Sequence, residues 1–427
     1  MKIYRVLICL FLIIFSYIFP VFADEEDLEN PIDFSYITSS SSEIITEPSI
    51  NSRAAIVLDR NSGLILYGKN ENEKRKMAST TKIMTAIVVI ENANLESIVT
   101  ISQKAAGTGG SRLGLHTNDK VSVKDLLYGL LLCSGNDAAV ALAEFVGGDL
   151  PGFSNLMNNK VSELGLTSTH FVTPHGLDNE SHYTTAYELA KIADYALKNE
   201  TFRNIVGTKN HTITINKYSK SLSNTNELLG NFEGVYGIKT GFTNGANRCL
   251  VTAIKRNNMD LICIVLGADT KKDRTRDSVN LINYIYSNFE LVNIKDKILS
   301  EFDNWKLCNS SSFKVEKGKS NEVDIALESL PYDFLPINSK HLDDISIYIY
   351  CNTDFTAPLP ANSSIGYISL SIANENIFTL KIYNTNSVEQ KNCTEFFYDI
   401  IFFTFHNTNN LVVDDFLSCI YITCSIT

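Results

Sequence analysis

The periodicity of apolar residues changes three times before residue 290, and the resulting order of strands and helices restricts the fold more than any other feature of the chain. Ala54–Asp59 and Leu64–Tyr67 are short apolar runs on either side of Arg60-Asn61-Ser62-Gly63, a pattern that predicts a β-hairpin. Helical patterns follow at residues 79–91, 121–132, 137–146, 153–164 and 185–197. Strand patterns return at residues 235–241, 249–255 and 259–267, before a helical pattern at 277–289. Because strands precede and follow the helices, we expect an α+β sheet with a helical block inserted into it.

The remaining segments have a different character. Residues 24–50 begin with an acidic run, contain four consecutive serines and show no sustained period, which indicates a linker. After residue 294 the helical period disappears, and turn-like segments separate alternating runs such as Ile345–Tyr350 and Ile365–Ser371. The chain has 427 residues, enough for two domains. We therefore expect one domain at residues 51–293, a smaller all-β domain at 294–391 and a tail at 392–427.

The N-terminus has the pattern of a secretory signal. Lys2 and Arg5 precede an uncharged apolar stretch from Val6 to Phe19, and Val21-Phe22-Ala23 offers small residues at a cleavage site. The apolar stretch is shorter than the roughly 20 residues that span a bilayer, so cleavage is favoured over an uncleaved anchor helix. We expect residues 1–23 to be removed and the mature protein to be exported. The full chain has a formal charge of −11, and this negative charge argues against a nucleic-acid partner.

Residue pairs that would bind a metal or exchange electrons are missing from the sequence. The chain contains no CxxC, and its seven histidines form no HExxH or similar spacing, so we predict no metal site. Cys133 and Cys263 lie in apolar runs, where a buried free thiol is the expected state. An exported enzyme without a metal or a GxSxG motif needs another way to produce a nucleophile.

Ser79 and Lys82 provide such a nucleophile. Positions i and i+3 of a helix face the same way, so the lysine amine reaches the serine hydroxyl. The amine acts as a base only if burial or a nearby cation lowers its pKa, and the apolar helix supplies burial. At the helix start, the Ser79 amide also favours developing negative charge. Taken alone, however, serine and lysine at this spacing are common on helix surfaces.

Two further motifs make the pattern specific. Ser134-Gly135-Asn136 falls at a break between helical patterns, and Lys239-Thr240-Gly241 falls in a strand pattern. In this chain order the three motifs match the SxxK, SxN and KTG elements of the serine penicillin-recognising enzymes. Residues 77–86, 130–144, 171–178 and 234–250 together resemble the low-molecular-mass penicillin-binding proteins that act as D-alanyl-D-alanine carboxypeptidases.

This resemblance covers about residues 50–290 and continues more faintly through residues 357–370. It implies a penicillin-binding, serine β-lactamase-like fold: an antiparallel sheet with helices on both sides and a helical subdomain, followed by a small all-β domain. It implies removal of the terminal D-alanine from peptidoglycan stem peptides without a cofactor. It also implies covalent inhibition by β-lactam antibiotics.

The resemblance assigns roles to the first two motifs. Ser79 attacks the carbonyl of the penultimate D-alanine and forms an acyl-ester, and Lys82 accepts its proton. Ser134 relays a proton to the departing amine. Asn136 donates a hydrogen bond to the substrate peptide and helps to hold Lys82.

The third motif binds substrate in the same comparison. Lys239 and Thr240 bind the terminal carboxylate, for which a cation and a hydroxyl are suited. Gly241 lets the substrate backbone lie against the strand, and the Phe242 amide completes an oxyanion hole with that of Ser79. His175 lies in a segment that resembles the family, but a single histidine in a loop more often has a structural role. Assistance in carboxylate binding near this motif is one interpretation of Arg248 and Arg274, and ordinary surface charges are the more common one.

The C-terminus and the exact reaction leave alternatives open. The family commonly ends in a helix on the outer membrane face, and Glu395–Phe405 is apolar enough for such a helix, but residues 392–427 contain no Lys or Arg. Peripheral membrane contact is therefore one interpretation of this segment, and packing on the β-domain is the other.

The closest functional alternative is a D,D-endopeptidase that cleaves cross-links. A β-lactamase or a non-catalytic wall-binding protein explains fewer of these features.

Overall fold

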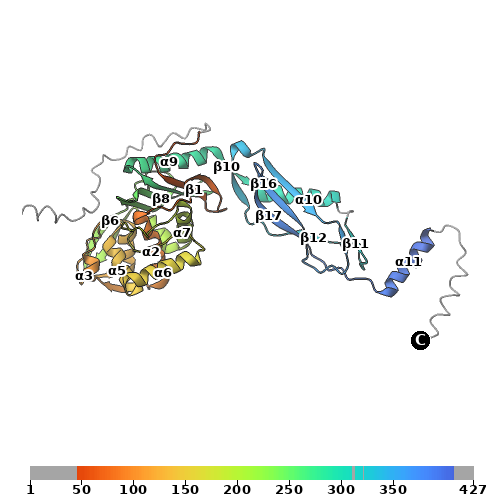
Figure 1. Ribbon diagram of the computed structural model, residues 1–427, viewed down its shortest axis with the longest axis horizontal. Helices are drawn as coiled ribbons and strands as arrows, with labels where there is room; N and C mark the ends of the chain where they lie inside the picture. Colours follow the sequence, from red (N-terminus) through yellow and green to blue (C-terminus); the bar gives the residue numbers. More distant parts are fainter. Residues whose placement is uncertain (1–45, 310–312, 321, 408–427) are drawn as a thin grey trace, which may run out of the picture. The chain divides into compact units, whose positions relative to one another are not determined.

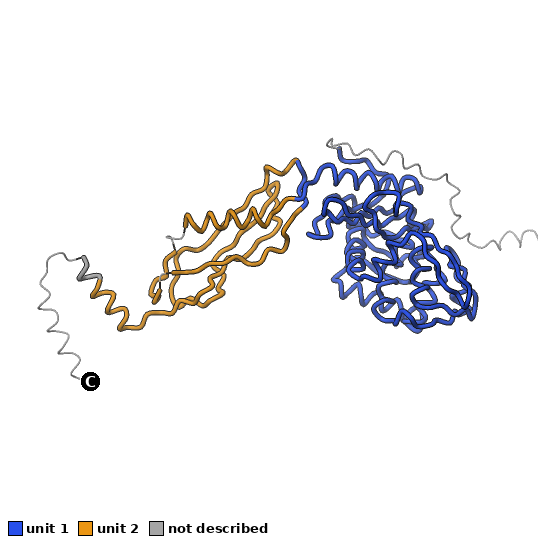
Figure 2. Tube along the Cα trace, turned by 180° about the vertical axis from the view of Figure 1, so that it is seen from behind, with its two compact units in different colours: residues 1–291, 336–339 blue, residues 292–335, 340–427 orange. Residues whose placement is uncertain are grey.

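The computed structural model describes residues 46–309, 313–320 and 322–407. The expected signal peptide, most of the expected linker and the last part of the tail lie outside these residues. The chain divides into two compact units (Figure 2): residues 1–291 with 336–339, and residues 292–335 with 340–427.

The centre of the first unit is a five-stranded antiparallel sheet. Its strand order is β2-β1-β9-β8-β7, with bounds β1 Ala54–Asp59, β2 Ile65–Lys69, β7 Val235–Thr243, β8 Asn247–Arg256 and β9 Met259–Ala268. The turn between β8 and β9 consists of Asn257 and Asn258, both at positive φ, as a tight hairpin requires. The expected hairpin and the three later strands are confirmed within a few residues, because alternation and turn residues mark both ends of each strand.

Both faces of this sheet are covered by helices, with the helical block on one side and α9 (Lys271–Asn288) on the other (Figure 1). Side chains alternate along β9: Ile262 and Ile264 pack in the core beneath the helical block, and Leu261 and Cys263 pack with residues of α9. The sheet is therefore buried on both sides, which explains the nearly continuous apolar runs of β8 and β9.

The helical block surrounds α2 (Lys82–Asn92), whose residues from Lys82 to Val89 are all buried. The other helices of the block are α3 Gln103–Ala106, α4 Val123–Leu131, α5 Asn136–Gly147, α6 Leu150–Glu163, α7 Ala186–Lys198 and α8 Glu200–Val206. A smaller sheet borders the block in the order β3-β4-β5-β6, with bounds β3 Ile98–Thr100, β4 Lys120–Ser122, β5 Asn210–Ile215 and β6 Tyr218–Ser223. The β5–β6 hairpin is mostly exposed, so it lacks the apolar pattern that would have predicted it.

The second unit contains a four-stranded antiparallel sheet in the order β12-β17-β16-β14. Its strands are β12 Ile325–Leu327, β14 Ile345–Cys351, β16 Ser364–Ile372 and β17 Glu375–Asn384. β11 Lys314–Glu316 pairs with β15 Asp354–Thr356. β10 Phe289–Asn293 pairs with β13 Phe334–Asn338, and most residues of these two strands belong to the first unit. The sequence pattern missed α10 (Ile294–Asn309), because Ile294, Ile298 and Phe302 are its only buried residues and form a narrow apolar stripe.

Near the C-terminus, α11 spans Cys393–Asn407 and agrees with the apolar segment identified in the sequence. Phe397, Tyr398, Ile400 and Phe402 of this helix are exposed. Over the ranges that the structure describes, we find no helix with the length and apolar character needed to cross a membrane.

Candidate active site

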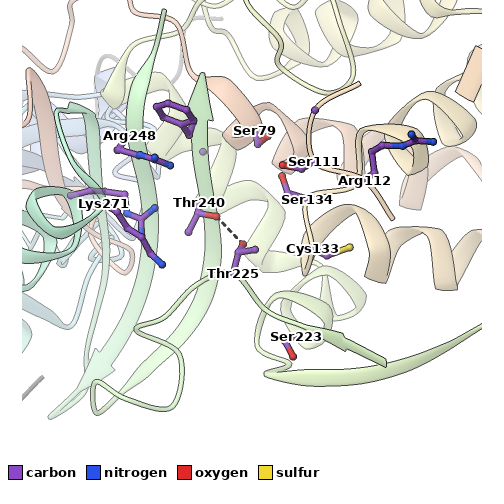
Figure 3. Close-up of a pocket in the computed structure, with 14 residues that line it drawn as sticks. Ser79, Ser111, Arg112, Cys133, Ser134, Ser223, Thr225, Thr240, Arg248 and Lys271 are labelled. Carbon is purple, nitrogen blue, oxygen red and sulfur yellow. Dashed lines mark hydrogen bonds between the residues drawn. The ribbon is translucent and has the colours of Figure 1, made fainter. Parts of the chain in front are cut away.

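The three sequence motifs converge on one cavity of about 640 Å³ in the first unit. Its walls come from the turn before α2, the loop before α5, β7, β8 and the start of α9. The residues that line it are Ser79, Gly110, Ser111, Arg112, Cys133, Ser134, Ser223, Thr225, Thr240, Gly241, Phe242, Arg248, Lys271 and Arg274. In Figure 3 the side chains of Ser79, Ser111 and Ser134 gather at one point between β7 and the helical block.

Ser79 lies in a short 3-10 turn, η2 (Ala78–Thr81), and not in the α-helix that the sequence predicts from residue 79. The helix begins three residues later because Ala78 adopts a positive φ of 49° and the Thr80 hydroxyl donates to the Met77 carbonyl at 2.6 Å. The tight turn still brings the i and i+3 side chains together. The predicted contact between Ser79 and Lys82 therefore forms by a different local geometry.

Lys82 is fully buried, with no solvent-exposed surface, and its amine lies within hydrogen-bond distance of three oxygen atoms. Lys82 Nζ lies 2.8 Å from Ser79 Oγ, 2.7 Å from Asn136 Oδ1 and 2.9 Å from the His175 carbonyl oxygen. Each contact comes from a different segment of the chain. They hold the amine against the serine hydroxyl, at the distance that proton transfer requires.

The second motif forms the opposite wall. Ser134 has a φ of 62°, and its buried Oγ has no hydrogen-bond partner among the described residues. A buried hydroxyl without a partner is costly unless a ligand or water satisfies it, so this hydroxyl is suited to contact a bound substrate. Asn136 is the first residue of α5, and its Nδ2 donates to the Gly109 carbonyl at 2.8 Å.

The third motif lies on β7, at the edge of the sheet. Lys239 is buried and donates from Nζ to the Thr240 carbonyl at 3.0 Å. Thr240 and Thr225 share a hydroxyl hydrogen bond of 2.8 Å, drawn in Figure 3. A Cβ on Gly241 would lie 3.2 Å from the Ser79 amide nitrogen, so only glycine lets β7 approach the turn this closely without crowding. The Phe242 ring stacks beneath Arg248, with 3.6 Å between the guanidinium carbon and the ring centre.

Comparison with known proteins agrees with this arrangement. The sequence profile of the family described as D-alanyl-D-alanine carboxypeptidase matches residues 41–270. DacF of Bacillus subtilis, a D-alanyl-D-alanine carboxypeptidase, is 34% identical over 324 residues, which cover 74% of this chain and 81% of DacF. DacA of Haemophilus influenzae is 33% identical over 362 residues, which cover 81% of this chain and 87% of DacA. This chain belongs to the D-alanyl-D-alanine carboxypeptidase family.

Solved structures support the same fold. Penicillin binding protein 5 of Haemophilus influenzae is 30% identical with a TM-score of 0.67, covering 81% of this chain and all of that protein. The Streptomyces K15 DD-transpeptidase is 37% identical with a TM-score of 0.54, covering 56% of this chain and 98% of that protein. The predicted fold class is confirmed, and the chain is a serine-type peptidase of the hydrolase class.

Asp137 is an important residue of this carboxypeptidase that the motif analysis missed. Its buried carboxylate accepts hydrogen bonds from the backbone amides of Leu113, Gly114 and Leu115 at 2.7, 2.7 and 3.0 Å. These bonds fix the loop that carries Gly110, Ser111 and Arg112 over the cavity. The sequence signal was its position directly after Ser134-Gly135-Asn136, but only the fold reveals its partners.

Arg274 is not the surface charge that the sequence favoured. It is 4% exposed, lines the cavity and pairs with Glu227, which also accepts from the Thr275 hydroxyl at 2.6 Å. Burial alone would raise the pKa of Glu227, but Arg274, Thr275 and Lys271 together lower it below its ordinary value. Arg248, Lys271 and Arg274 place three cations on the β7–β8 side of the cavity, with Glu227 as the paired anion.

His175 is buried and contacts the site through its backbone carbonyl. The carbonyl of His175 accepts from Lys82, and its Nδ1 accepts from the Leu177 amide at 3.2 Å. The pKa of the His175 imidazole is lowered to about 3, mainly by burial and further by the charge of Lys82 and by the nearby His182. Among the described residues, no group of three or more His, Cys, Asp or Glu side chains is arranged to bind a metal ion.

The two buried histidines predict a loss of stability in acid. The pKa of His182 is lowered to about 4, mainly by burial and further by His170. An unfolded histidine titrates near 6.5, so below this pH the unfolded chain binds protons that the folded chain does not. Each histidine should therefore remove about 1.4 kcal/mol from the free energy of unfolding per pH unit between about 6.5 and its folded pKa.

Urea unfolding at pH 7 and pH 5 measures this effect. The fall in unfolding free energy should be smaller in His182→Gln than in the wild type, because glutamine does not titrate. Equal falls in the two proteins would contradict the assignment of a neutral buried His182.

Proposed function

We propose that this carboxypeptidase removes the terminal D-alanine from peptidoglycan stem peptides through an acyl-enzyme on Ser79. The Ser79 oxygen attacks the carbonyl carbon of the penultimate D-alanine while Lys82 accepts the hydroxyl proton. The new C–O bond forms, the peptide C–N bond breaks, and D-alanine leaves as an amine that takes up a proton. Water then hydrolyses the ester and restores Ser79. The observation that carries this proposal is the 2.8 Å contact between Ser79 Oγ and the fully buried Lys82 amine.

The second motif serves the leaving group in this mechanism. Ser134 relays the proton to the departing amine, and its unpartnered buried hydroxyl beside the cavity supports that role. Asn136 holds Lys82 through Oδ1 and offers an amide to the substrate peptide. Removing Ser134 should therefore slow cleavage of the peptide bond more than attack on a strained β-lactam, whose leaving amine stays tethered.

The third motif binds and polarises the substrate. Lys239 and Thr240 bind the terminal carboxylate from β7, assisted by the positive field of Arg248, Lys271 and Arg274. Gly241 accommodates the substrate backbone, and the amides of Ser79 and Phe242 form the oxyanion hole. The close approach of Gly241 to the Ser79 amide supports this assignment. β-Lactam antibiotics would occupy the same cavity as covalent inhibitors.

Incubation with a pentapeptide that ends in D-Ala-D-Ala, with cross-linked dimer in parallel, tests the proposal. The wild type should release free D-alanine and attach labelled penicillin at Ser79, and Ser79→Ala should do neither. Ser219→Ala, at an exposed position of β6, is the matched control and should behave as the wild type. Release of D-alanine by Ser79→Ala would contradict the mechanism. Cleavage of the dimer alone would favour the endopeptidase alternative.

We also propose that the enzyme acts in the cell envelope. Residues 51–293 form the catalytic domain and residues 294–391 a β-rich domain, with residues 1–23 directing export to the cell envelope. The exposed Phe397, Tyr398 and Phe402 of α11 support peripheral contact of the tail with the outer face of the cytoplasmic membrane. Co-sedimentation with lipid vesicles, lost in Phe397→Ser/Phe402→Ser, tests this contact.

A further inference from the structure

The peptide group between Ala78 and Ser79 connects the active site to the protein interior. A peptide group is planar, so its carbonyl oxygen and its N–H point in opposite, fixed directions. Whatever holds the Ala78 oxygen therefore also sets the direction of the Ser79 N–H. Ala78 has a positive φ of 49°, a conformation that a residue with a Cβ adopts only when its surroundings impose it.

Thr81 makes one of the contacts that hold Ala78 in this conformation. Its hydroxyl donates to the Ala78 carbonyl at 2.8 Å and lies 2.8 Å from Nε2 of His182. A hydroxyl has only one proton to donate, so His182 must donate from Nε2 to the Thr81 oxygen. Both side chains are buried, with exposures of 0% for Thr81 and 2% for His182.

The other ring nitrogen fixes the same tautomer. His182 Nδ1 accepts the backbone N–H of Val172 at 3.0 Å, so it carries no proton. The ring also packs edge-on against Phe171, with 5.6 Å between ring centres. A continuous series of hydrogen bonds thus runs from the Val172 N–H through His182 and Thr81 to the Ala78 oxygen. Every donor and acceptor in the series has a defined direction.

We infer that His182 is a positioning residue that orients the Ser79 N–H, acting through Thr81 and the Ala78 carbonyl. This inference rests on the proposed function, in which that N–H stabilises the oxyanion. Loss of the bond from Nε2 leaves the Thr81 hydroxyl free to rotate away from Ala78. The Ser79 N–H then loses alignment with the oxyanion, and acylation slows while substrate binding on β7 is unchanged.

Two substitutions of His182 separate positioning from stability. In His182→Asn the side-chain amide reaches the place of Nδ1 but not that of Nε2, so it keeps Val172 and loses Thr81. In His182→Gln the amide reaches the place of Nε2, so it keeps Thr81 and loses Val172. His182→Asn thus loses the bond at Nε2, and His182→Gln loses the bond at Nδ1, which Val172 shares with a longer contact from the Thr173 N–H at 3.4 Å. Because the Thr173 contact is long and weak, the thermal unfolding midpoints should fall by similar amounts.

Saturation kinetics of Ser79 acylation by labelled penicillin provide the readout. The maximal acylation rate should fall about tenfold in His182→Asn and less than threefold in His182→Gln. The penicillin concentration at half-maximal rate should change less than twofold in both. Thr81→Val should resemble His182→Asn, and combining the two should add little, since both remove the same hydrogen bond. Thr81→Ser, which keeps the hydroxyl, should acylate as the wild type.

Two results would overturn the inference. Equal acylation rates in His182→Asn and His182→Gln, at equal unfolding midpoints, would mean that His182 only stabilises the loop. Failure of the wild type itself to acylate Ser79 would overturn the proposed function, and this inference with it. The two failures are distinguishable because only the second affects the wild-type protein.

Discussion

Lys82→Met should lower the rate of Ser79 acylation about a thousandfold, the order of magnitude that a positioned general base contributes. Methionine has a similar length and fills the buried space, but it has no amine to accept the Ser79 proton. Lys82→Arg should lose as much, because the guanidinium keeps the positive charge yet does not release a proton in proteins. The pair therefore separates the need for a base from the need for a cation.

Stopped-flow measurement of acylation by labelled penicillin checks this prediction. Far-ultraviolet circular dichroism and thermal unfolding of each variant serve as folding controls, since Lys82→Met leaves the Asn136 and His175 oxygens without a donor. A folded Lys82→Arg that acylates within tenfold of the wild type would show that the amine acts electrostatically. Another group would then have to accept the proton.

Gly176→Ala should reduce acylation at least a hundredfold and destabilise the protein by several kcal/mol. Gly176 has a φ of 85°, and a Cβ there would overlap the Ala78 carbonyl and crowd the Thr81 hydroxyl. The backbone before Gly176 is tied to α2, because the Pro174 carbonyl accepts from the Thr85 hydroxyl at 2.6 Å and the His175 carbonyl accepts from Lys82 at 2.9 Å. The turn that carries Ser79 must shift to make room.

Gly165→Ala is the matched control. Gly165 also has a positive φ, 66°, but a Cβ at this position would have no atom within 4 Å. Its cost should be about 1–2 kcal/mol, the penalty for an L-residue in the left-handed region, and acylation should stay at the wild-type rate. Chemical unfolding and penicillin labelling of both variants measure the difference. Equal effects of the two substitutions would mean that conformation, and not the overlap with Ala78, decides the outcome.

Much of the first unit could be predicted from the sequence because its signals are local. Apolar alternation identified β7, β8 and β9, and a 3.6-residue period identified α4 to α7, each within a few residues. The exposed β5–β6 hairpin and α10 were missed because few of their side chains are buried. A periodic pattern of apolar residues arises where one face of a helix or strand is buried. Elements with few buried side chains therefore have no clear pattern in the sequence.

The candidate active site also has a part that the sequence predicts and a part that it does not. Ser79 and Lys82 are three residues apart, and any tight helical turn brings them together, so the sequence was sufficient to pair them. The start of α2 at Lys82 was not predictable, because the positive φ of Ala78 depends on Thr81 and on the loop at Gly176. Nothing local to Arg274 indicated that it would be buried against Glu227.

The sequence alone determined the order of the well-buried strands and helices, the three motifs and the chemistry that a serine, two lysines and a strand-edge glycine permit. These features follow from short-range geometry and from residue type. The tertiary structure decided which distant groups complete the site. The Asn136 side chain and the His175 carbonyl contact Lys82. Asp137 accepts from the Leu113 amide, and His182 contacts the Thr81 hydroxyl. Such partners lie tens of residues apart and meet only because the folded core fixes the backbone between them.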